Sequence, residues 1–264
     1  MENIRKALEK ARARRESDAP AAGLGDHRPA GPSGGYTRTR VVRPDPGKLK
    51  QHRIIVAEKG HRLTDTFRIL RTHVMQEMTA GRHRTLAITG PNPNEGKTFI
   101  AVNLSVSLAM LTEYTVLLVD LDLRRPAVHK CFGLKPDVGL SEYLMGSVLL
   151  PDCLINPGID RLVLLPGGAP LRASSELLSS PKMMNLAREL KERYPDRVIV
   201  YDLPPLLATD DALVFLSHAE CCVLVASEGV TQVGDIQRSL RLLQSTKLIG
   251  TVLNKSKGRV RNFY

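Results

Sequence analysis

The sequence is poor in aromatic residues, which make up 4% of its 264 residues, and it contains no tryptophan. A hydrophobic core must therefore be built from aliphatic side chains, and the 42% hydrophobic content is sufficient for that. No apolar run approaches the length that spans a bilayer. No secretory pattern opens the chain, where Ile4 to Leu8 is charged and amphipathic. These absences argue against a membrane-embedded or exported protein, and we expect a cytoplasmic one.

Cysteine is also scarce, and its spacing matches no metal-ligand pattern. Two of the four cysteines, Cys221 and Cys222, fall in an apolar run typical of a strand. The other two are Cys131 and Cys153. Buried thiols with a structural role are therefore expected.

Acidic residues are too few to balance the basic ones, and the formal net charge is +11. Residues 1–53 carry much of the excess. Such a basic segment favours an anionic partner: an acidic protein, a phospholipid surface or a nucleic acid. Aromatic residues that would stack on bases are not interleaved with the charges, so a specific nucleic-acid partner is not expected. A tail that merely improves solubility is the alternative.

Composition divides the chain into four segments. Residues 1–16 have the pattern of an amphipathic helix with a narrow apolar stripe. Residues 17–53 are rich in Pro, Gly, Ala and Ser, as flexible linkers are. Residues 54–255 have a globular composition, and residues 256–264 form a basic tail that ends in Tyr264.

The most informative stretch is residues 86–98, LAITGPNPNEGKT. A short buried strand is followed by a loop of Gly, Pro and Asn, and then by Gly96-Lys97-Thr98 at the start of an apolar run over 99–111 that we interpret as an amphipathic helix. This order is typical of a phosphate-binding loop, in which backbone amides at a helix N-terminus face an anion. The strict spacing fails, because Pro91 occupies the position of the first glycine and Gly90 lies one residue earlier. An ordinary turn before a helix is the alternative.

Three aspartates follow apolar runs that we interpret as buried strands. Residues 115–123, TVLLVDLDL, carry Asp120 and Asp122, and alternation along a strand would point both side chains the same way. Residues 197–202, RVIVYD, end in Asp202. The carboxyl ends of parallel strands are where α/β sheets bind ligands. Buried carboxylates need a nearby cation, and Mg²⁺ with Lys97 would supply one.

Strands alternate with helices along the globular segment, and several strands are continuous apolar runs. This pattern predicts an α/β fold: a mostly parallel sheet with helices on both faces, of the phosphate-loop NTPase type. Residues 62–79 and 174–194 are each predicted to form a helix, and the pair Asp210-Asp211 is interpreted as helix capping.

One predicted helix, residues 62–79, carries Asp65, Arg68 and Arg71 at a spacing of three, so that they share a face. That face is either solvated or an interface at which arginines meet carboxylates of a neighbouring subunit.

Several separated motifs together resemble one family. TGPNPNEGKT, LLVDLDLRRPAVHKCFGL and VIVYDLPPLL occur in the order found in the bacterial protein-tyrosine kinases of exopolysaccharide loci. SSELLSS at 174–180 is also similar to that family, and the resemblance covers roughly residues 54–255. It implies an ATP- and Mg²⁺-dependent tyrosine autokinase that regulates polysaccharide polymerisation or export. It also implies a homo-oligomer, a membrane chain-length regulator as activator, a cognate tyrosine phosphatase, and recruitment to the inner face of the plasma membrane.

The resemblance also implies roles for individual residues. Lys97 would bind phosphates, Thr98, Asp120 and Asp202 would hold the metal, and Asp122 would be the base for a tyrosine hydroxyl. Asn254 would meet the adenine edge, and Tyr264 would be the phosphate acceptor. The subunit interface would use Asp65, Arg68 and Arg71. The nucleotide-binding loop would comprise Asn94, Glu95, Gly96, Lys97, Thr98 and Phe99.

Two departures from the family pattern stand out. Asn94 replaces a glycine of the family's loop, and asparagine adopts left-handed backbone conformations more readily than most residues. The tyrosine cluster at the C-terminus is reduced to Tyr264. The alternatives are an ATPase switch that resembles partition and cell-division ATPases, and a nucleotide-binding scaffold without catalysis. The ATPases carry a second lysine that would fall on Asn92, which counts against them.

Overall fold

The computed structural model describes residues 39–42, 54, 63–194 and 196–257. The chain divides into two units, Met1–Gly35 and Tyr36–Tyr264, and every described residue belongs to the second. The predicted helix over 1–16, most of the predicted linker, and Tyr264 lie outside the described residues.

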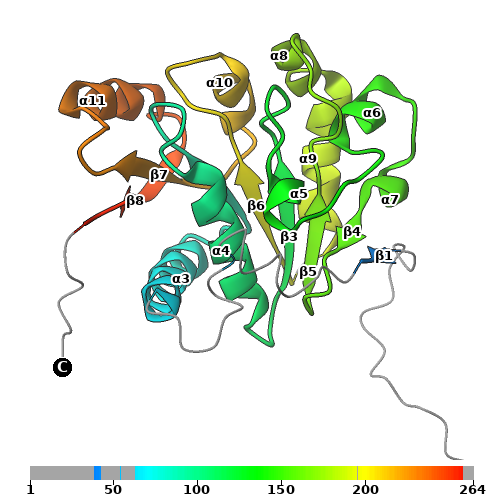
Figure 1. The fold of residues 1–264 in the computed structure, drawn as a ribbon, viewed down its shortest axis with the longest axis horizontal. Coiled ribbons are helices and arrows are strands. Elements are labelled where there is room, and N and C mark those ends of the chain that lie inside the picture. Colours follow the sequence, from blue (N-terminus) through cyan, green and yellow to red (C-terminus); the bar gives the residue numbers. More distant parts are fainter. Residues whose placement is uncertain (1–38, 43–53, 55–62, 195, 258–264) are drawn as a thin grey trace, which may run out of the picture. The chain divides into compact units, whose positions relative to one another are not determined.

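The centre of the described unit is an eight-stranded sheet in the order β1-β4-β5-β3-β6-β2-β7-β8 (Figure 1). All neighbouring strands are parallel except the pair β4–β5, so the predicted mostly parallel α/β sheet is confirmed. The strands are β1 (Arg40–Val41), β2 (Thr85–Thr89), β3 (Thr115–Asp120), β4 (Ile155–Asn156), β5 (Leu162–Leu165), β6 (Arg197–Asp202), β7 (Cys221–Ser227) and β8 (Lys247–Asn254).

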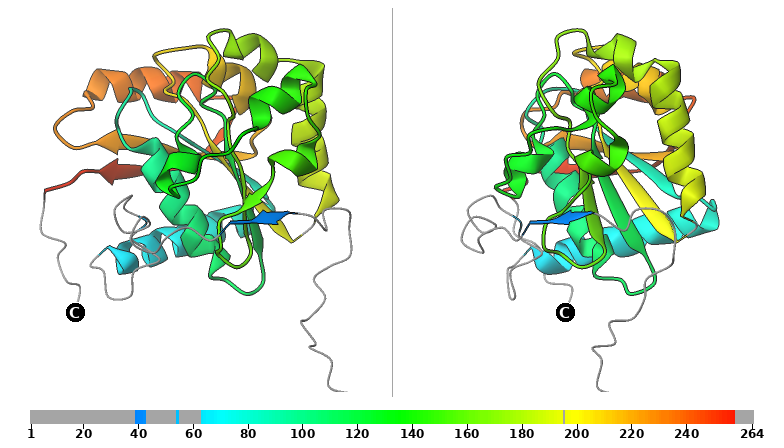
Figure 2. Two further views of the ribbon diagram at one scale, coloured as in Figure 1. Left: turned by 45° about the vertical axis from the view of Figure 1, so that its right-hand side comes forward. Right: turned by 90° about the vertical axis from the view of Figure 1, so that its right-hand side faces the viewer.

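Helices cover both faces of the sheet, as predicted, and Figure 2 shows strands lying between α4 and α9. Alternation within β2 explains the two cores: Leu86 and Ile88 pack with α3 and α4, whereas Ala87 packs with α9 and α10. The helices are α3 (Thr64–Ala80), α4 (Lys97–Ala109), α5 (Val128–Cys131), α6 (Leu140–Met145), α7 (Leu150–Cys153), α8 (Ser174–Leu178), α9 (Pro181–Arg193), α10 (Asp211–Leu216) and α11 (Val233–Leu242).

Helix α4, which follows the glycine loop, is buried on nearly every side. It contacts α3 as well as strands β2, β3 and β6, so its polar residues Asn103 and Ser105 are buried with the apolar ones. The prediction of an amphipathic helix was therefore wrong. A helix enclosed between a sheet and a second helix has no solvated face.

The single helix predicted over 174–194 is two helices, α8 and α9. The chain breaks at Ser180, whose extended backbone precedes Pro181 and whose hydroxyl accepts a hydrogen bond from the Met183 amide at 3.2 Å. Proline disfavours a helical conformation in the residue before it and is well suited to the first helical position. Ser180 is thus the N-cap of α9.

Strand β3 ends at Asp120, three residues before the predicted end. Asp122 therefore does not lie on the strand, and the predicted strand bound was wrong, although its charge still lies close enough to raise the pKa of Asp120. It lies instead in a turn in which its Oδ1 accepts the Arg125 amide at 3.0 Å. The register nevertheless pairs Asp120 with Asp202 on β6, so two predicted site residues lie side by side at the carboxyl ends of neighbouring strands.

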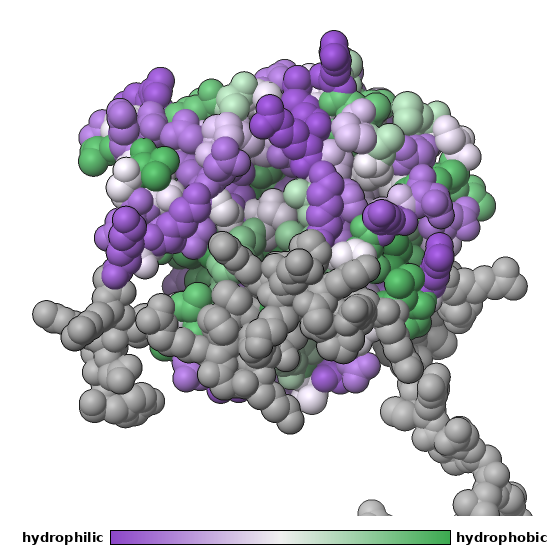
Figure 3. Space-filling view, in the orientation of Figure 1, coloured by the Kyte–Doolittle hydropathy of each residue, from purple (hydrophilic) through white to green (hydrophobic). Residues whose placement is uncertain are grey.

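Residues 39–42, the described part of the predicted linker over 17–53, include the short strand β1. Arg40–Val41 pairs in parallel with β4, and the Val42 amide donates to the Asn156 carbonyl at 2.9 Å. The linker prediction was wrong for these residues, because two adjacent β-branched valines favour strand pairing. Within the described residues, no helix is both long and apolar enough to cross a membrane. Figure 3 shows mostly hydrophilic side chains along the upper rim, where the β3 and β6 arrows of Figure 1 point.

Candidate functional site

The loop between β2 and α4 begins at Gly90, and the structure explains why glycine is needed there. A Cβ at this position would lie 2.4 Å from the Val225 carbonyl oxygen and 2.6 Å from a Glu95 carboxylate oxygen. Such contacts are far below any tolerated by a side chain, so the loop backbone approaches β7 closely at Gly90. Position 90 therefore requires a glycine, although the strict loop pattern would place one at position 91.

Two left-handed residues shape the end of the loop. Asn94 has φ 62° and Gly96 has φ 93°, which confirms that asparagine supports the loop at the position of the family's glycine. A Cβ on Gly96 would lie 2.1 Å from the amide nitrogen of Asn254. That amide donates to the Glu95 carbonyl at 2.9 Å. The predicted contact of Asn254 with an adenine edge is not tested by this arrangement and stays a prediction.

Glu95 is fully buried and holds the loop together from inside. Its carboxylate accepts the Asn92 amide at 2.8 Å and the Thr231 hydroxyl at 2.6 Å. Thr231 also accepts the Ser227 amide at 2.8 Å, so the loop is attached to the end of β7. The Glu95 side chain therefore braces the loop internally, and only its backbone can serve the predicted nucleotide contact.

Lys97, the first residue of α4, folds back over the loop. Its Nζ donates to the Asn92 carbonyl at 2.9 Å. Burial lowers the pKa of Lys97, and the nearby negative charges of Asp202, Glu95 and Asp122 oppose that shift. The Lys97 ammonium group thus lies at the N-terminus of α4, with carboxylates nearby. An anion bound at that helix N-terminus would be neutralised by the ammonium group.

The next two residues of α4 point in different directions. Thr98 lies close enough to Asp202 to favour the ionised form of that carboxylate. Phe99 instead packs edge-on against Phe67 of α3, with ring centroids 5.8 Å apart. The predicted nucleotide contact of Phe99 is therefore open to its backbone only.

Asp120 is buried at the end of β3, and only one of its two carboxylate oxygens has hydrogen-bond partners among the described residues. Its Oδ2 accepts the Ala127 and Val128 amides at 2.9 and 3.0 Å, whereas its Oδ1 is buried without a hydrogen-bond partner in the described structure. Burial raises the pKa of Asp120 to about 7; the charge of Asp122 acts in the same direction, and the two amides oppose it. The free oxygen is thus a ligand position without a partner from the described residues.

Asp202 is the least satisfied polar group of the site. Both of its carboxylate oxygens are buried, and neither meets the geometry of a hydrogen bond with any described residue. Burial raises the pKa of Asp202 well above its ordinary value, as does the charge of Asp120, while Thr98 and Lys97 counteract the shift. A buried unpaired carboxylate is costly, so a cation at this position would remove a large penalty.

The oxygen donors fit the predicted Mg²⁺ site. Thr98, Asp120 and Asp202 offer a hydroxyl and carboxylates, the ligand types that this ion prefers. Among the described residues, no cluster of three or more His, Cys, Asp or Glu side chains could hold a metal by itself. Any Mg²⁺ would therefore depend on Thr98 and on oxygens brought by a ligand, as is usual for a phosphate-bound ion.

The remaining predicted residues fall into two places. Asp122 is partly exposed and lies close enough to Asp120 for its charge to raise the pKa of that residue. Asp65 and Arg68 form an exposed ion pair of 3.0 Å on α3, whereas Arg71 donates to the Ser107 carbonyl of α4 at 2.9 Å. Arg71 is therefore committed within the chain, and the three residues do not present one common exposed group.

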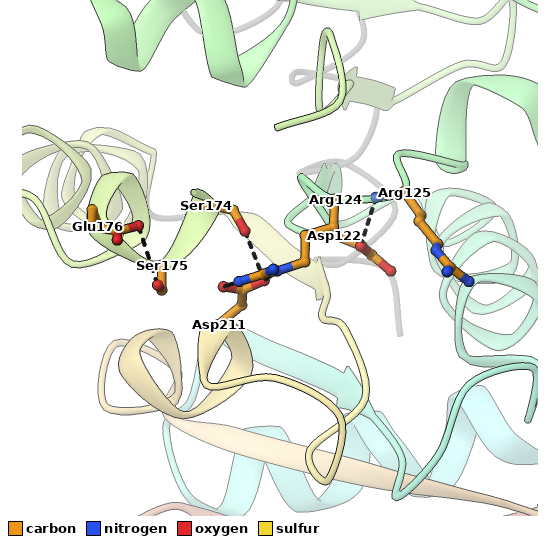
Figure 4. Close-up of polar contacts among 7 residues, drawn as sticks. All are labelled: Asp122, Arg124, Arg125, Ser174, Ser175, Glu176 and Asp211. Carbon is orange, nitrogen blue, oxygen red and sulfur yellow. Dashed lines mark hydrogen bonds and ion pairs between the residues drawn. The ribbon is translucent and has the colours of Figure 1, made fainter. Parts of the chain in front are cut away.

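One polar cluster beside the site was not anticipated. Asp211 was interpreted as helix capping, yet its buried carboxylate pairs with Arg124 at 2.6 Å and accepts the Ser174 hydroxyl at 2.8 Å (Figure 4). The capping interpretation was wrong, because Asp210 is the N-cap of α10 and its side chain makes no capping bond. The one sequence signal that pointed to Asp211 was the acidic pair Asp210-Asp211 before a predicted helix.

A phosphate loop at a helix N-terminus, facing two strand-end carboxylates in a parallel sheet, defines a nucleotide-binding protein of the phosphate-loop class. Residues 86–264 match the family described as CobQ/CobB/MinD/ParA nucleotide binding domain. The chain is also 24% identical to the septum site-determining protein MinD of Pyrococcus horikoshii, solved with Mg-ADP, with a TM-score of 0.55 over 66% of this chain and 72% of that one. That likeness concerns the fold alone.

More similar proteins narrow the class. The tyrosine-protein kinase YwqD of Bacillus subtilis is 31% identical over 220 residues, which are 82% of this chain and 92% of that protein. The kinase domain of the Escherichia coli tyrosine kinase ETK superimposes with a TM-score of 0.71 at 26% identity, over 85% of this chain and 94% of that one. The chain belongs to the bacterial tyrosine-protein kinases.

Some relatives are much longer. The tyrosine-protein kinase ptk of Acinetobacter johnsonii is 32% identical over 192 residues, which are 72% of this chain and 26% of that protein. The succinoglycan biosynthesis transport protein ExoP of Rhizobium meliloti is 33% identical over 210 residues, 77% of this chain and 26% of that protein. The chain thus spans about a quarter of the length of these two relatives and nearly all of YwqD.

The unpaired Asp202 predicts a gain in stability from Asp202→Asn. Because the pKa of Asp202 is raised in the folded state, folding opposes the ionisation of this carboxyl group. Asp202 therefore lowers the free energy of unfolding increasingly as the pH rises above the ordinary Asp pKa of about 4. At pH 8, without ligand, we expect the variant to exceed the wild type by about 1–3 kcal/mol in free energy of unfolding. Urea denaturation at pH 8 and pH 5 measures this, and the gain should shrink at pH 5.

The exposed Asp160 provides the control. Asp160→Asn should leave the free energy of unfolding unchanged at both pH values. A loss of stability in Asp202→Asn at pH 8 would contradict the description of Asp202 as a buried charge without a partner.

Proposed function

We propose that this chain transfers the γ-phosphoryl group of ATP to tyrosine hydroxyls of other copies of itself, and that it regulates exopolysaccharide polymerisation or export in this way. The observation that carries the proposal is the placement of Lys97 at the N-terminus of α4, within electrostatic reach of Asp202 and Asp122. Phosphoryl transfer needs positioning and charge neutralisation more than covalent chemistry, and this site offers both.

The residues divide the work according to their burial. Loop amides and Lys97 bind and orient the phosphates, while Asp120 and Asp202 lie too deep to reach a protein substrate. Asp122 is partly exposed, so it is the carboxylate that can accept the proton of an incoming tyrosine hydroxyl. Mg²⁺, held by Thr98, Asp120 and Asp202, would supply neutralisation of the charge on the phosphate oxygens.

The two alternatives make different chemical demands. An ATPase switch of the partition type would use a second lysine at position 92. Asn92 is there instead, and its side-chain amide donates to the Asp235 carboxylate of α11 at 2.8 Å. A scaffold would need no base, and it would leave Asp122 at the rim without a role. Incubation with labelled ATP separates the three: label on tyrosine, free phosphate, or neither.

The first functional prediction concerns Lys97→Ala. Loss of one charge-assisted contact that strengthens in the transition state costs about 3 kcal/mol, which is roughly a hundredfold in rate. Radiolabel transfer to tyrosine by purified protein measures the effect, and circular dichroism verifies the fold. Lys247→Ala serves as the control, because Lys247 is exposed at the amino end of β8, the opposite end from the site. Activity of Lys97→Ala within a few-fold of the wild type would reject the site.

We further propose that α3 forms the interface between subunits. Asp65 and Arg68 are 80% and 58% exposed, and beside them Ile69 is 59% exposed. An exposed apolar side chain next to an arginine that can leave a weak surface pair suits an interface. Arg71 supports the interface only indirectly, because it holds α3 against α4.

Single variants therefore separate the two arginines. Arg68→Ala should weaken self-association by about tenfold or more while leaving the unfolding midpoint unchanged. Arg71→Ala should instead lower the unfolding midpoint, because the Ser107 carbonyl loses its partner. Analytical ultracentrifugation and urea denaturation measure the two effects. Glu77→Ala, exposed near the end of α3, is the control. Unchanged association of Arg68→Ala would leave that face as ordinary solvated surface.

We propose Tyr264 as the phosphate acceptor. The tail carries Lys255, Lys257, Arg259 and Arg261, so it would be attracted to a neighbour's acidic site. Phosphorylation adds about −1.5 to −2 charge and should weaken that docking. After incubation with Mg-ATP, mass spectrometry should find phosphate on Tyr264. Modification of Tyr36 with Tyr264 unmodified would overturn tail docking and leave the kinase proposal standing.

The partners and location follow from the same proposal. A membrane chain-length regulator would act as activator, a cognate tyrosine phosphatase would reverse the modification, and the protein would work in the cytoplasm, recruited to the inner face of the plasma membrane. The likeness to ExoP, whose name assigns it to succinoglycan biosynthesis and transport, supports a partner in polysaccharide export.

A further inference from the structure

An ion pair with one fully buried partner lies beside the site, between the loop after β3 and the start of α10. The Nε of Arg124 donates to Oδ2 of Asp211 at 2.6 Å, and its NH2 donates to Oδ1 at 3.3 Å. The Asp211 side chain is 0% exposed, whereas the Arg124 side chain is 35% exposed. Ser174, also buried, donates its hydroxyl to Oδ2 of Asp211 at 2.8 Å. We call these three residues the Arg124 clamp.

The clamp joins three segments that are distant in sequence, as Figure 4 shows. Arg124 belongs to the turn that carries Asp122, Ser174 begins α8, and Asp211 begins α10, the first helix after β6 and Asp202. The clamp therefore connects the segments that follow the two strands whose ends bear the site carboxylates.

Burying these charges contributes little to stability by itself, because desolvation offsets much of the attraction. Such a pair contributes more to geometry than to stability. The bidentate contact of a guanidinium with a carboxylate fixes both their distance and their relative direction. The adjacent Arg125 shows the contrast: its side chain is exposed and points away from Arg124 in Figure 4.

We propose that Asp211 is a positioning residue for phosphoryl transfer, because it holds Arg124 and thereby the turn that presents Asp122. Within that turn the Arg125 amide donates to Oδ1 of Asp122 at 3.0 Å and to its carbonyl at 3.1 Å. Outside it, the Leu171 amide holds the Leu123 carbonyl at 2.8 Å. The Asp120 carboxylate holds the far end of the segment through the Ala127 and Val128 amides, and the Leu121 amide donates to the Asp202 carbonyl at 2.9 Å. Arg124 is the side chain that ties the middle of the turn to α8 and α10. A displacement of about 1 Å at a reacting group can lower a rate a hundredfold.

This inference rests on the proposed function, since it assigns Asp122 the role of base. It also makes a claim that needs no activity: without the clamp, the turn over residues 121–128 opens more often. Hydrogen exchange followed by mass spectrometry measures that opening directly through the Arg125 amide. The two readouts keep the clamp and the kinase proposal separate.

The experiment compares two variants with the wild type. Arg124→Lys keeps the charge and loses the forked contact. The triple change Arg124→Met, Ser174→Ala and Asp211→Leu replaces the whole clamp with apolar side chains and leaves no buried charge behind. For both we expect a 10–100-fold lower kcat, a KM for ATP within twofold of the wild type, about tenfold faster exchange over 121–128, and a urea midpoint close to that of the wild type.

Glu189→Gln is the matched control, because Glu189 pairs with Arg193 on the exposed side of α9, where a lost ion pair should change none of these readouts. An unchanged kcat or unchanged exchange in Arg124→Lys would overturn the proposal. So would a loss of kcat that only accompanies weaker ATP binding and a lower urea midpoint, since that is a structural role. If the wild type transfers no phosphate, the proposed function fails, and exchange alone decides whether the clamp orders the turn.

Discussion

Two buried carboxylates on neighbouring strands, Asp120 and Asp202, constrain the rest of this structure. They pair in register across β3 and β6, and together they leave three oxygens buried without partners from the described residues. Negative charge at that depth is unfavourable unless a cation is close. Lys97 is placed where it can offset part of the charge of Asp202: burial lowers the pKa of Lys97, and the charges of Asp202, Glu95 and Asp122 oppose that shift. A cation bound beside these oxygens, as the proposed Mg²⁺ would be, would offset the remaining charge.

The phosphate loop is held in place by hydrogen bonds from side chains as well as by the conformations of its glycines. The Glu95 carboxylate accepts hydrogen bonds from the Asn92 backbone amide and the Thr231 hydroxyl. The side-chain amide of Asn254, on β8, donates to the Glu95 carbonyl. Because β7 and β8 lie beyond β2 in the sheet, the loop is supported from the edge opposite to the Asp122 turn. The loop and the Asp122 turn are therefore held by different parts of the fold, the loop by β7 and β8 and the turn by α8 and α10.

The sequence predicted the strands and helices well where a local pattern was strong. The strand over 197–202 and the helix over 62–79 appear within two residues of their predicted bounds, because apolar period and length suffice for both. It failed at Ser180, where a proline divides an otherwise continuous helical pattern, and at Asp122, where a turn replaces the end of a strand. Apolar periodicity registers neither cause: at Ser180 the following proline disfavours a helical conformation, and at Asp122 the Arg125 amide closes a turn.

The sequence by itself determined the fold class, the phosphate loop and the two strand-end aspartates, because each depends on residues close together in the chain. Only the tertiary structure decided that Gly90 has no room for a side chain, that α4 is buried on nearly every side, and that Asp211 pairs with Arg124. Those outcomes depend on contacts between distant segments; Arg124 and Asp211 are 87 residues apart. Burial and charge pairing are properties of the packed chain, and no spacing of residue types encodes them locally.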